Sequence, residues 1–154
     1  MGDTYVQAYF HLVFAVKNRK ALIDESWENQ LQKYITGIVQ MHNHKLIAIG
    51  GMPDHIHIYI GYNLNQNIPN LVEEIKTSSN KWINENRLSY EKFSWQKGYG
   101  AFTHSHSAIA TVANYIQNQK QHHSKKSFKK EYLDLLSKHD IQFKNEYLFN
   151  FFDD

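Results

Sequence analysis

The chain has 154 residues, a formal net charge of +2 and no cysteine. This length suits one domain with a buried core, so we expect a single domain over residues 1–154, with a core at 5–123 and a C-terminal helix and tail at 124–154. The absence of cysteine excludes disulfides, thiolate zinc sites and cysteine nucleophiles. The sequence has no apolar run of the roughly 20 residues that a membrane-spanning helix needs and no secretion signal at its start. A cytoplasmic location is therefore expected.

The first part of the chain alternates strictly between apolar and polar residues. Such a period of two predicts a long strand over residues 5–16 with one apolar face. A basic turn follows at residues 17–20. Asp24 can then cap a helix whose apolar positions recur at helical spacing as far as Met41.

The remaining elements continue this pattern. In chain order they are a short strand at 46–49, a turn at 50–54, an alternating strand at 55–60, a helix with Pro69 in its first turn, one or two short strands within 93–103 that bend at Gly98 or Gly100, a helix from Ser107 to about Gln121, and a helix at 125–138. The order predicts an α+β ferredoxin-like (RRM-like) βαββαβ sandwich with an antiparallel sheet, helices on one face and extra C-terminal helices.

The ten histidines include several close pairs, and one pair lies on a predicted strand. His55 and His57 are two residues apart, so they share one face while the isoleucines beside them face the core. Two neutral imidazoles on one face can bind a divalent ion such as Mn²⁺, or Mg²⁺ with a further oxygen ligand. The alternative is an ordinary polar face. A second pair, His104 and His106, lies where a strand ends, and exposed loop histidines are expected there.

The helix after Ser107 carries a second candidate group beside its apolar stripe. Tyr115, Gln119 and His122 recur at positions i, i+4 and i+7, so they lie on one helix face. A tyrosine hydroxyl can attack phosphorus while a nearby amide oxygen joins two imidazoles around a metal ion. Packing of Tyr115 at the edge of the stripe is the alternative.

Together these segments resemble the small single-tyrosine transposases of the HUH nuclease superfamily, which mobilise insertion sequences as single-stranded DNA. The resemblance spans about residues 5–150 and depends on the order and spacing of its motifs. The segments that carry it are His11-Leu12-Val13-Phe14, Met52-Pro53-Asp54-His55-Ile56-His57, Trp95-Gln96-Lys97-Gly98-Tyr99-Gly100-Ala101-Phe102, and Tyr115-Ile116-Gln117-Asn118-Gln119 followed by His122-His123.

The resemblance implies that Tyr115 is the nucleophile and that His55, His57 and Gln119 bind the divalent metal, Mg²⁺ or Mn²⁺. It also implies cleavage through a 5′-phosphotyrosine with release of a 3′-hydroxyl, and DNA hairpins at the element ends as the bound substrate. A homodimer is implied too, in which the tyrosine helix of one subunit completes the histidine strand of the other. The family pattern assigns no role to His104 and His106, and the roles of His122 and His123 stay open as well.

Basic and aromatic side chains are the candidates for contact with DNA. Single-strand binders combine cations that follow the phosphates with aromatic platforms for the bases. The cations are Lys17, Arg19, Lys20, Lys125, Lys126, Lys129 and Lys130, and the platforms are Tyr99, Trp95 and Phe102. A solvated helix face is the alternative for the lysine cluster, and a core position is the alternative for Trp95 and Phe102.

Three other functions fit parts of this pattern. An HUH replication initiator or relaxase-type nickase shares the chemistry, although such proteins are commonly larger. A non-catalytic single-stranded nucleic-acid binding module also uses a ferredoxin-like sheet, and a structural metal-binding domain is weakened by the absence of cysteine. The non-catalytic module gains support if the tyrosine helix packs far from the histidine strand.

Overall fold

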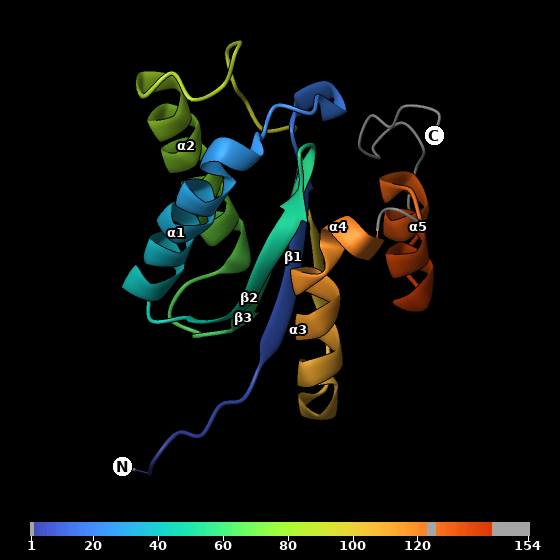
Figure 1. Cartoon of the computed structure of the whole chain (residues 1–154). Helices are drawn as coiled ribbons and strands as arrows, with labels where there is room; N and C mark the ends of the chain where they lie inside the picture. The colour runs from blue at the N-terminus through green and yellow to red at the C-terminus, as the bar shows by residue number, and fades with distance from the viewer. Residues whose placement is uncertain (1, 123–125, 143–154) are drawn as a thin grey trace.

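A four-stranded antiparallel sheet lies at the centre of the computed structural model, which describes residues 2–122 and 126–142 (Figure 1). Its strands are β1 (Tyr9–Ala15), β2 (Lys45–Met52), β3 (His55–Gly61) and β4 (Gly100–Thr103). They follow the spatial order β2-β3-β1-β4, and each neighbouring pair is antiparallel. This arrangement confirms the predicted α+β ferredoxin-like class.

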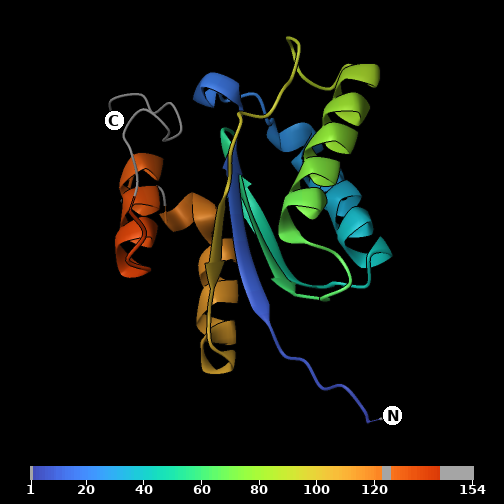
Figure 2. The ribbon, with the colours of Figure 1, turned by 180° about the vertical axis from the view of Figure 1, so that it is seen from behind.

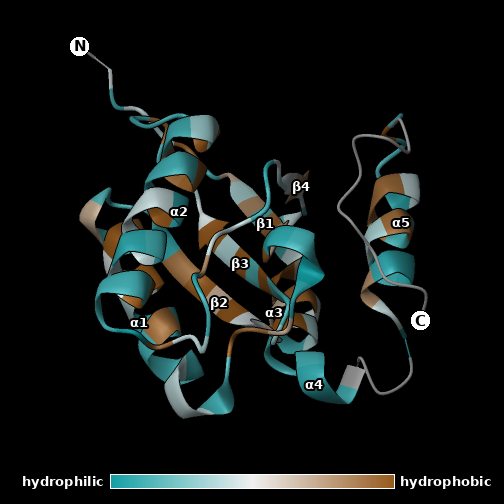
Figure 3. Ribbon diagram, turned by 90° about the horizontal axis from the view of Figure 1, so that it is seen from above, coloured by the Kyte–Doolittle hydropathy of each residue, from teal (hydrophilic) through white to brown (hydrophobic). Residues whose placement is uncertain are grey.

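Two long helices cover one face of the sheet (Figure 1). They are α1 (Glu25–Met41) and α2 (Ile68–Glu85). Each begins at a side-chain cap, because Asp24 accepts a hydrogen bond from the Ser26 amide and Asn67 accepts one from the Asn70 amide. In Figure 3 their apolar residues, coloured brown, face the sheet, and their polar residues, coloured teal, face outward. This is the division that helical amphipathicity predicts.

Shorter helices lie on the opposite face of the sheet, as Figures 1 and 2 show. They are α3 (Ile109–Gln117), α4 (Gln119–His122) and α5 (Phe128–Lys138). The chain also has two 3₁₀ turns, at Lys17–Arg19 and His106–Ala108. The helix that Ser107 was predicted to cap is broken at Asn118, and its N-cap is Ala108, one residue later than predicted, because Ser107 lies within the preceding 3₁₀ turn. Ser127 caps α5 by accepting a hydrogen bond from the Lys130 amide.

The first strand is shorter than its alternating sequence predicts. Pairing of β1 with β3 begins at Tyr9, which lies opposite Gly61, the last residue of β3. Tyr5 is 88% exposed and Val6 is 51% exposed. The alternation therefore continues beyond the end of the partner strand, and β strands form only where a partner accepts their hydrogen bonds.

Of the remaining sequence predictions, Lys125, His123 and the tail at 143–154 lie outside the described residues. Within the described part of the chain, the helices are too short or too polar to cross a membrane.

Two glycines lie close to His57 within the sheet and allow helices to approach it. Gly50 of β2 lies directly opposite His57, and Val13 of β1 lies on its other side, followed by Gly100 of β4. A Cβ atom on Gly50 would stand 2.2 Å from the backbone oxygen of Ile116, and one on Gly100 would stand 3.0 Å from the Tyr132 ring. The two glycines thus permit α3 and α5 to pack closely on either side of this histidine.

We expect Gly50→Ala to lower the free energy of unfolding by about 1–3 kcal/mol, because the added methyl group collides with α3 backbone that cannot rotate away. Thermal unfolding followed by circular dichroism measures the loss. Gly37→Ala on α1 is the matched control, because an added Cβ there meets no atom within 4 Å and a helix interior favours alanine by about 0.5–1 kcal/mol. Equal melting temperatures for the two variants would contradict the close approach of α3.

Candidate active site

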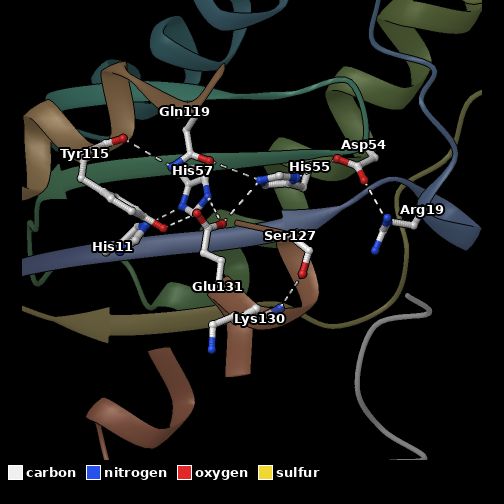
Figure 4. A network of polar contacts seen from close by, with 10 residues as sticks. All are labelled: His11, Arg19, Asp54, His55, His57, Tyr115, Gln119, Ser127, Lys130 and Glu131. Carbon is white, nitrogen blue, oxygen red and sulfur yellow. Dashed lines mark hydrogen bonds and ion pairs between the residues drawn. The ribbon is translucent and has the colours of Figure 1, made fainter. Parts of the chain in front are cut away.

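His55 and His57 both point from β3 toward the face covered by α3 and α5 (Figure 4). Their side chains are fully buried, which overturns the alternative of an ordinary exposed polar face. The Nδ1 atom of His55 lies 2.7 Å from a carboxylate oxygen of Asp54, and Nδ1 of His57 lies 2.7 Å from Nε2 of His11. In both rings the Nδ1 atom contacts another side chain, and the two Nε2 atoms face the same point between the helices.

His11 reaches this site from the neighbouring strand β1. Burial, together with the nearby His57 and His104, holds the pKa of His11 well below its ordinary value. A neutral His11 can accept a hydrogen bond from Nδ1–H of His57, and this contact directs Nε2 of His57 toward Glu131. Hydrogen bonds of this kind fix the orientation and tautomer of histidines that bind metals.

Asp54 and Arg19 form a second support, behind His55. One carboxylate oxygen of Asp54 bonds to His55, and the other lies 2.9 Å from Nε of Arg19. Burial raises the pKa of Asp54, but the hydrogen bond to His55 and the charges of His55 and Arg19 outweigh burial and hold it below the ordinary value. For His55 burial lowers the pKa, whereas Asp54 and Glu131 outweigh it and raise the value. The Arg19–Asp54 pair therefore keeps an ionised carboxylate against the histidine.

Tyr115 and Gln119 bring the tyrosine helix to the same point. The end of α3 packs through Ile116 against Ala48 and Tyr59 of the sheet, and this places the Tyr115 ring 5.8 Å from the His57 ring between centroids. The amide oxygen of Gln119 lies 3.4 Å from Nε2 of His55. The structure thus brings together Tyr115, Gln119, His55 and His57 within a single chain.

Sequence reasoning missed Glu131 as a member of this site, as it missed the contact of His11 with His57. One of its carboxylate oxygens lies 2.9 Å from Nε2 of His57, and the other accepts a hydrogen bond from the Tyr115 hydroxyl. Burial and the Glu131 charge raise the pKa of Tyr115 well above its ordinary value. Glu131 lies three residues after Phe128 and one before Tyr132, both buried. A carboxylate within a buried helix stripe requires a charged or hydrogen-bonding partner, and that pattern was the available signal.

The donor set of this cluster fits a divalent metal ion. Within the described residues, ligand atoms of His55, His57 and Glu131 all lie within 4.8 Å of one another. Two imidazole nitrogens with carboxylate and amide oxygens suit Mn²⁺ and are acceptable to Mg²⁺. Phe128 stacks on the His55 ring at 3.8 Å between centroids and covers that side of the site.

The side chains predicted to contact DNA are partly buried in the core and partly exposed. Trp95 and Phe102 belong to the hydrophobic core, so they cannot serve as stacking platforms. Arg19 is also buried, and its ion pair with Asp54 favours a positioning role over a phosphate contact. Exposed cations remain at Lys17, Lys20, Lys129 and Lys130, and Lys126 is partly exposed. Lys20 pairs with Glu91 and Lys126 with Asp134, and Tyr99 is partly exposed.

The two members of the second histidine pair, His104 and His106, lie in different environments. His104 is partly buried, and its Nε2 atom lies 3.5 Å from Nδ1 of His11. His106 is exposed and lies 3.0 Å from the Tyr9 hydroxyl. The expectation of exposed loop histidines therefore holds for His106 and is wrong for His104, because β4 carries His104 toward His11 on the next strand.

Comparison with known proteins decides which family this arrangement represents. The sequence profile described as "Transposase IS200 like" matches residues 4–119. The chain belongs to this IS200-like transposase family. The match confirms the resemblance to single-tyrosine HUH transposases, and it spans the histidine strand, the tyrosine and Gln119 but stops short of Glu131.

Individual relatives of this IS200-like transposase agree with the family match. The chain is 26% identical over 124 residues to the ISDra2 transposase TnpA of Deinococcus radiodurans, covering 77% of this chain and 89% of the relative. A transposase crystal structure from Deinococcus radiodurans R1 has a TM-score of 0.60 and 24% identity over 77% of this chain and 96% of the other. A REP-associated tyrosine transposase bound to a REP hairpin has a TM-score of 0.55 and 14% identity over 75% and 68%. These two structures share the fold.

Proposed function

We propose that this IS200-like transposase cleaves and rejoins single-stranded DNA through a covalent 5′-phosphotyrosine, with Tyr115 as the nucleophile. The observation that carries the proposal is the convergence of the Tyr115 hydroxyl, the Gln119 amide and the two histidine Nε2 atoms on one buried point (Figure 4). A hydroxyl beside a potential metal site is the arrangement that nucleophilic phosphoryl transfer requires.

The chemistry follows from the position of the hydroxyl. The Tyr115 oxygen forms a bond to the scissile phosphorus, and the bond from phosphorus to the 3′ oxygen breaks. The tyrosine proton is lost, and the departing 3′ oxygen gains a proton to become a free hydroxyl. That hydroxyl can later attack a second phosphotyrosine linkage, so the bond energy is retained and the reaction needs no nucleotide cofactor.

His55, His57 and Gln119 are the proposed ligands of the divalent ion, Mg²⁺ or Mn²⁺. A bound ion would polarise the scissile phosphate and stabilise charge on the leaving oxygen. His11 and Asp54 hold the two imidazoles in the orientation that directs Nε2 toward this point. The proposed ligands His55, His57 and Gln119 are buried, whereas Tyr115 is partly exposed, so DNA has to approach from the side of Tyr115.

Hairpin DNA at the element ends is the proposed substrate, and a homodimer is the proposed active form. The relative solved with a REP hairpin supports the first point, because it shares this fold. Each chain of the dimer would carry a complete site, since Tyr115 lies beside the histidines of its own chain. Exposed lysines such as Lys17 and Lys129 are proposed phosphate contacts.

The rival function of a non-catalytic nucleic-acid binding module fits less well. That function would leave the tyrosine helix away from the histidine strand, whereas the Tyr115 ring also lies edge-on to His11, 6.4 Å between centroids. It would also leave a buried cluster of histidines and a carboxylate without a role, and burying such groups is costly.

The test is covalent capture of DNA. Purified protein incubated with a labelled single-stranded oligonucleotide that carries a flanking palindrome should form an adduct resistant to denaturation, attached to the 5′ end. Removal of divalent ions with a chelator should abolish the adduct, and added Mg²⁺ or Mn²⁺ should restore it. Noncovalent binding without cleavage under all metal conditions would favour the binding module.

A further inference from the structure

Glu131 occupies the position where the tyrosine and the two histidines meet, although it comes from the separate helix α5 (Figure 4). Its side chain is 1% exposed. One carboxylate oxygen, Oε1, lies 2.9 Å from Nε2 of His57 and 3.6 Å from Nε2 of His55. The other, Oε2, accepts the hydrogen bond of the Tyr115 hydroxyl. The carboxylate therefore bridges the histidine pair and the proposed nucleophile.

We propose that Glu131 is a fourth protein ligand of the divalent ion, with Oε1 bound to the ion and Oε2 holding the Tyr115 hydroxyl beside it. This inference rests on the proposed function, because it assumes the same metal site. It adds a carboxylate, supplied by α5, to the ligand set of His55, His57 and Gln119.

The distances between donor atoms support a shared ion. Neighbouring ligands of an octahedral ion with bonds of about 2.1 Å lie about 3.0 Å apart. Oε1 of Glu131 is 2.9 Å from Nε2 of His57, and the Gln119 amide oxygen is 3.4 Å from Nε2 of His55. Small inward movements would place these donors around one ion. Four protein ligands would leave two octahedral positions for phosphate or water oxygens.

Charge supports the same assignment. The imidazoles and the Gln119 amide bind a metal in their neutral forms, so that set of three carries no negative charge. Mg²⁺ and Mn²⁺ favour carboxylate oxygens, and Glu131 is the carboxylate whose ligand atom clusters with the histidines in the described part of the chain. A bound ion would also replace the proton between His57 and Glu131 and balance the buried carboxylate.

The packing of α5 makes this ligand rigid. Phe128, Tyr132 and Leu136 anchor the helix in the main hydrophobic core, and Ser127 caps its first turn. Glu131 lies among these residues, so its carboxylate is held at the site by the whole helix. Metal binding should consequently be coupled to the stability of α5.

Direct measurement of metal affinity tests the proposal. Wild-type protein and the Glu131→Gln variant are titrated with Mn²⁺ alone and followed by calorimetry and electron paramagnetic resonance. We expect Glu131→Gln to weaken Mn²⁺ binding by about tenfold or more. Asp134→Asn is the matched control, because it removes a carboxylate from an exposed position of the same helix. It should change the affinity by less than about twofold. Equal affinities for Glu131→Gln and wild type would overturn the proposal.

A second measurement uses the wild-type protein alone, so it holds even if the variant folds poorly. Saturating Mn²⁺ should slow amide hydrogen exchange within 128–138 as well as within β3, because a ligand from α5 ties that helix to the ion. Protection confined to β3 and the 109–122 region would overturn the assignment of Glu131.

The two proposals fail in different ways. If wild-type protein forms the covalent adduct but Glu131→Gln retains full Mn²⁺ affinity, the proposed function stands and the Glu131 ligand is rejected. Faster cleavage by Glu131→Gln at unchanged affinity would also reject it and would identify the carboxylate as an obstruction. If wild-type protein binds Mn²⁺ through Glu131 yet forms no adduct, the proposed function fails and the ligand assignment stands.

Discussion

Tyr115→Phe is expected to abolish the covalent protein–DNA adduct while leaving hairpin binding near the wild-type level. The variant removes the hydroxyl oxygen that forms the bond to phosphorus, and it retains the ring that packs between α3 and the histidine strand. Loss of a nucleophile reduces turnover by about a thousandfold or more. The adduct is measured on denaturing gels with labelled single-stranded DNA, and binding is measured by mobility shift at the same metal concentration.

Tyr9→Phe is the matched control for this substitution. Tyr9 lies on the same face of the sheet, but its hydroxyl bonds to His106 instead of Glu131. The control variant should form the adduct at the wild-type rate. An adduct that persists in Tyr115→Phe would show that another group attacks phosphorus, and the nucleophile assignment would then be wrong.

The Tyr115 substitution also removes the hydrogen bond to Glu131, which leaves one carboxylate oxygen without its phenol donor. A lost hydrogen bond to a buried charged group costs about 1–3 kcal/mol. We therefore expect Tyr115→Phe to melt at a slightly lower temperature than Tyr9→Phe. Activity and stability can be separated because the adduct assay is run well below both melting temperatures.

The part of this site that could be predicted from the sequence lies within single elements. Alternation in 55–60 places His55 and His57 on one face, and the helical period places Gln119 one turn after Tyr115. Both relations depend only on local geometry. The first is present in β3, whereas the helix breaks at Asn118 and Gln119 contacts His55 from the start of α4. The order of elements was likewise sufficient to predict the sheet and its two covering helices.

The part that could not be predicted depends on which elements meet. His11 reaches His57 because β1 pairs with β3 in one register, with Val13 opposite His57. Glu131 reaches the site because α5 docks through Phe128 and Tyr132. Neither the β1–β3 register nor the docking of α5 can be predicted from a local sequence period, because both depend on packing between distant parts of the chain. The same packing buries Arg19.

His57→Ala is expected to reduce cleavage by about a hundredfold or more, comparable with removing a group that stabilises the transition state. His57 contributes Nε2 to the proposed metal site and contacts both His11 and Glu131, so its loss disturbs more of the cluster than the loss of Gln119 would. Hairpin binding should persist, because the proposed phosphate contacts are exposed lysines outside the cluster. Adduct formation and mobility shift are measured on the same protein preparation.

His106→Ala is the matched control, since it also removes a histidine from a His-x-His pair but from an exposed position. It should retain both cleavage and binding. If His57→Ala lost hairpin binding and cleavage to the same extent, His57 would hold the fold together rather than serve the chemistry.

Mixing the two inactive variants locates the complete site. The Tyr115 and His57 rings are neighbours within one chain, so a mixture of Tyr115→Phe and His57→Ala should form no adduct, because every chain lacks one essential group. If the tyrosine helix instead served the partner subunit, mixed dimers would contain one intact tyrosine beside one intact histidine pair, and cleavage would return. Recovery of the adduct would therefore show that the helices exchange between subunits when the protein acts on DNA.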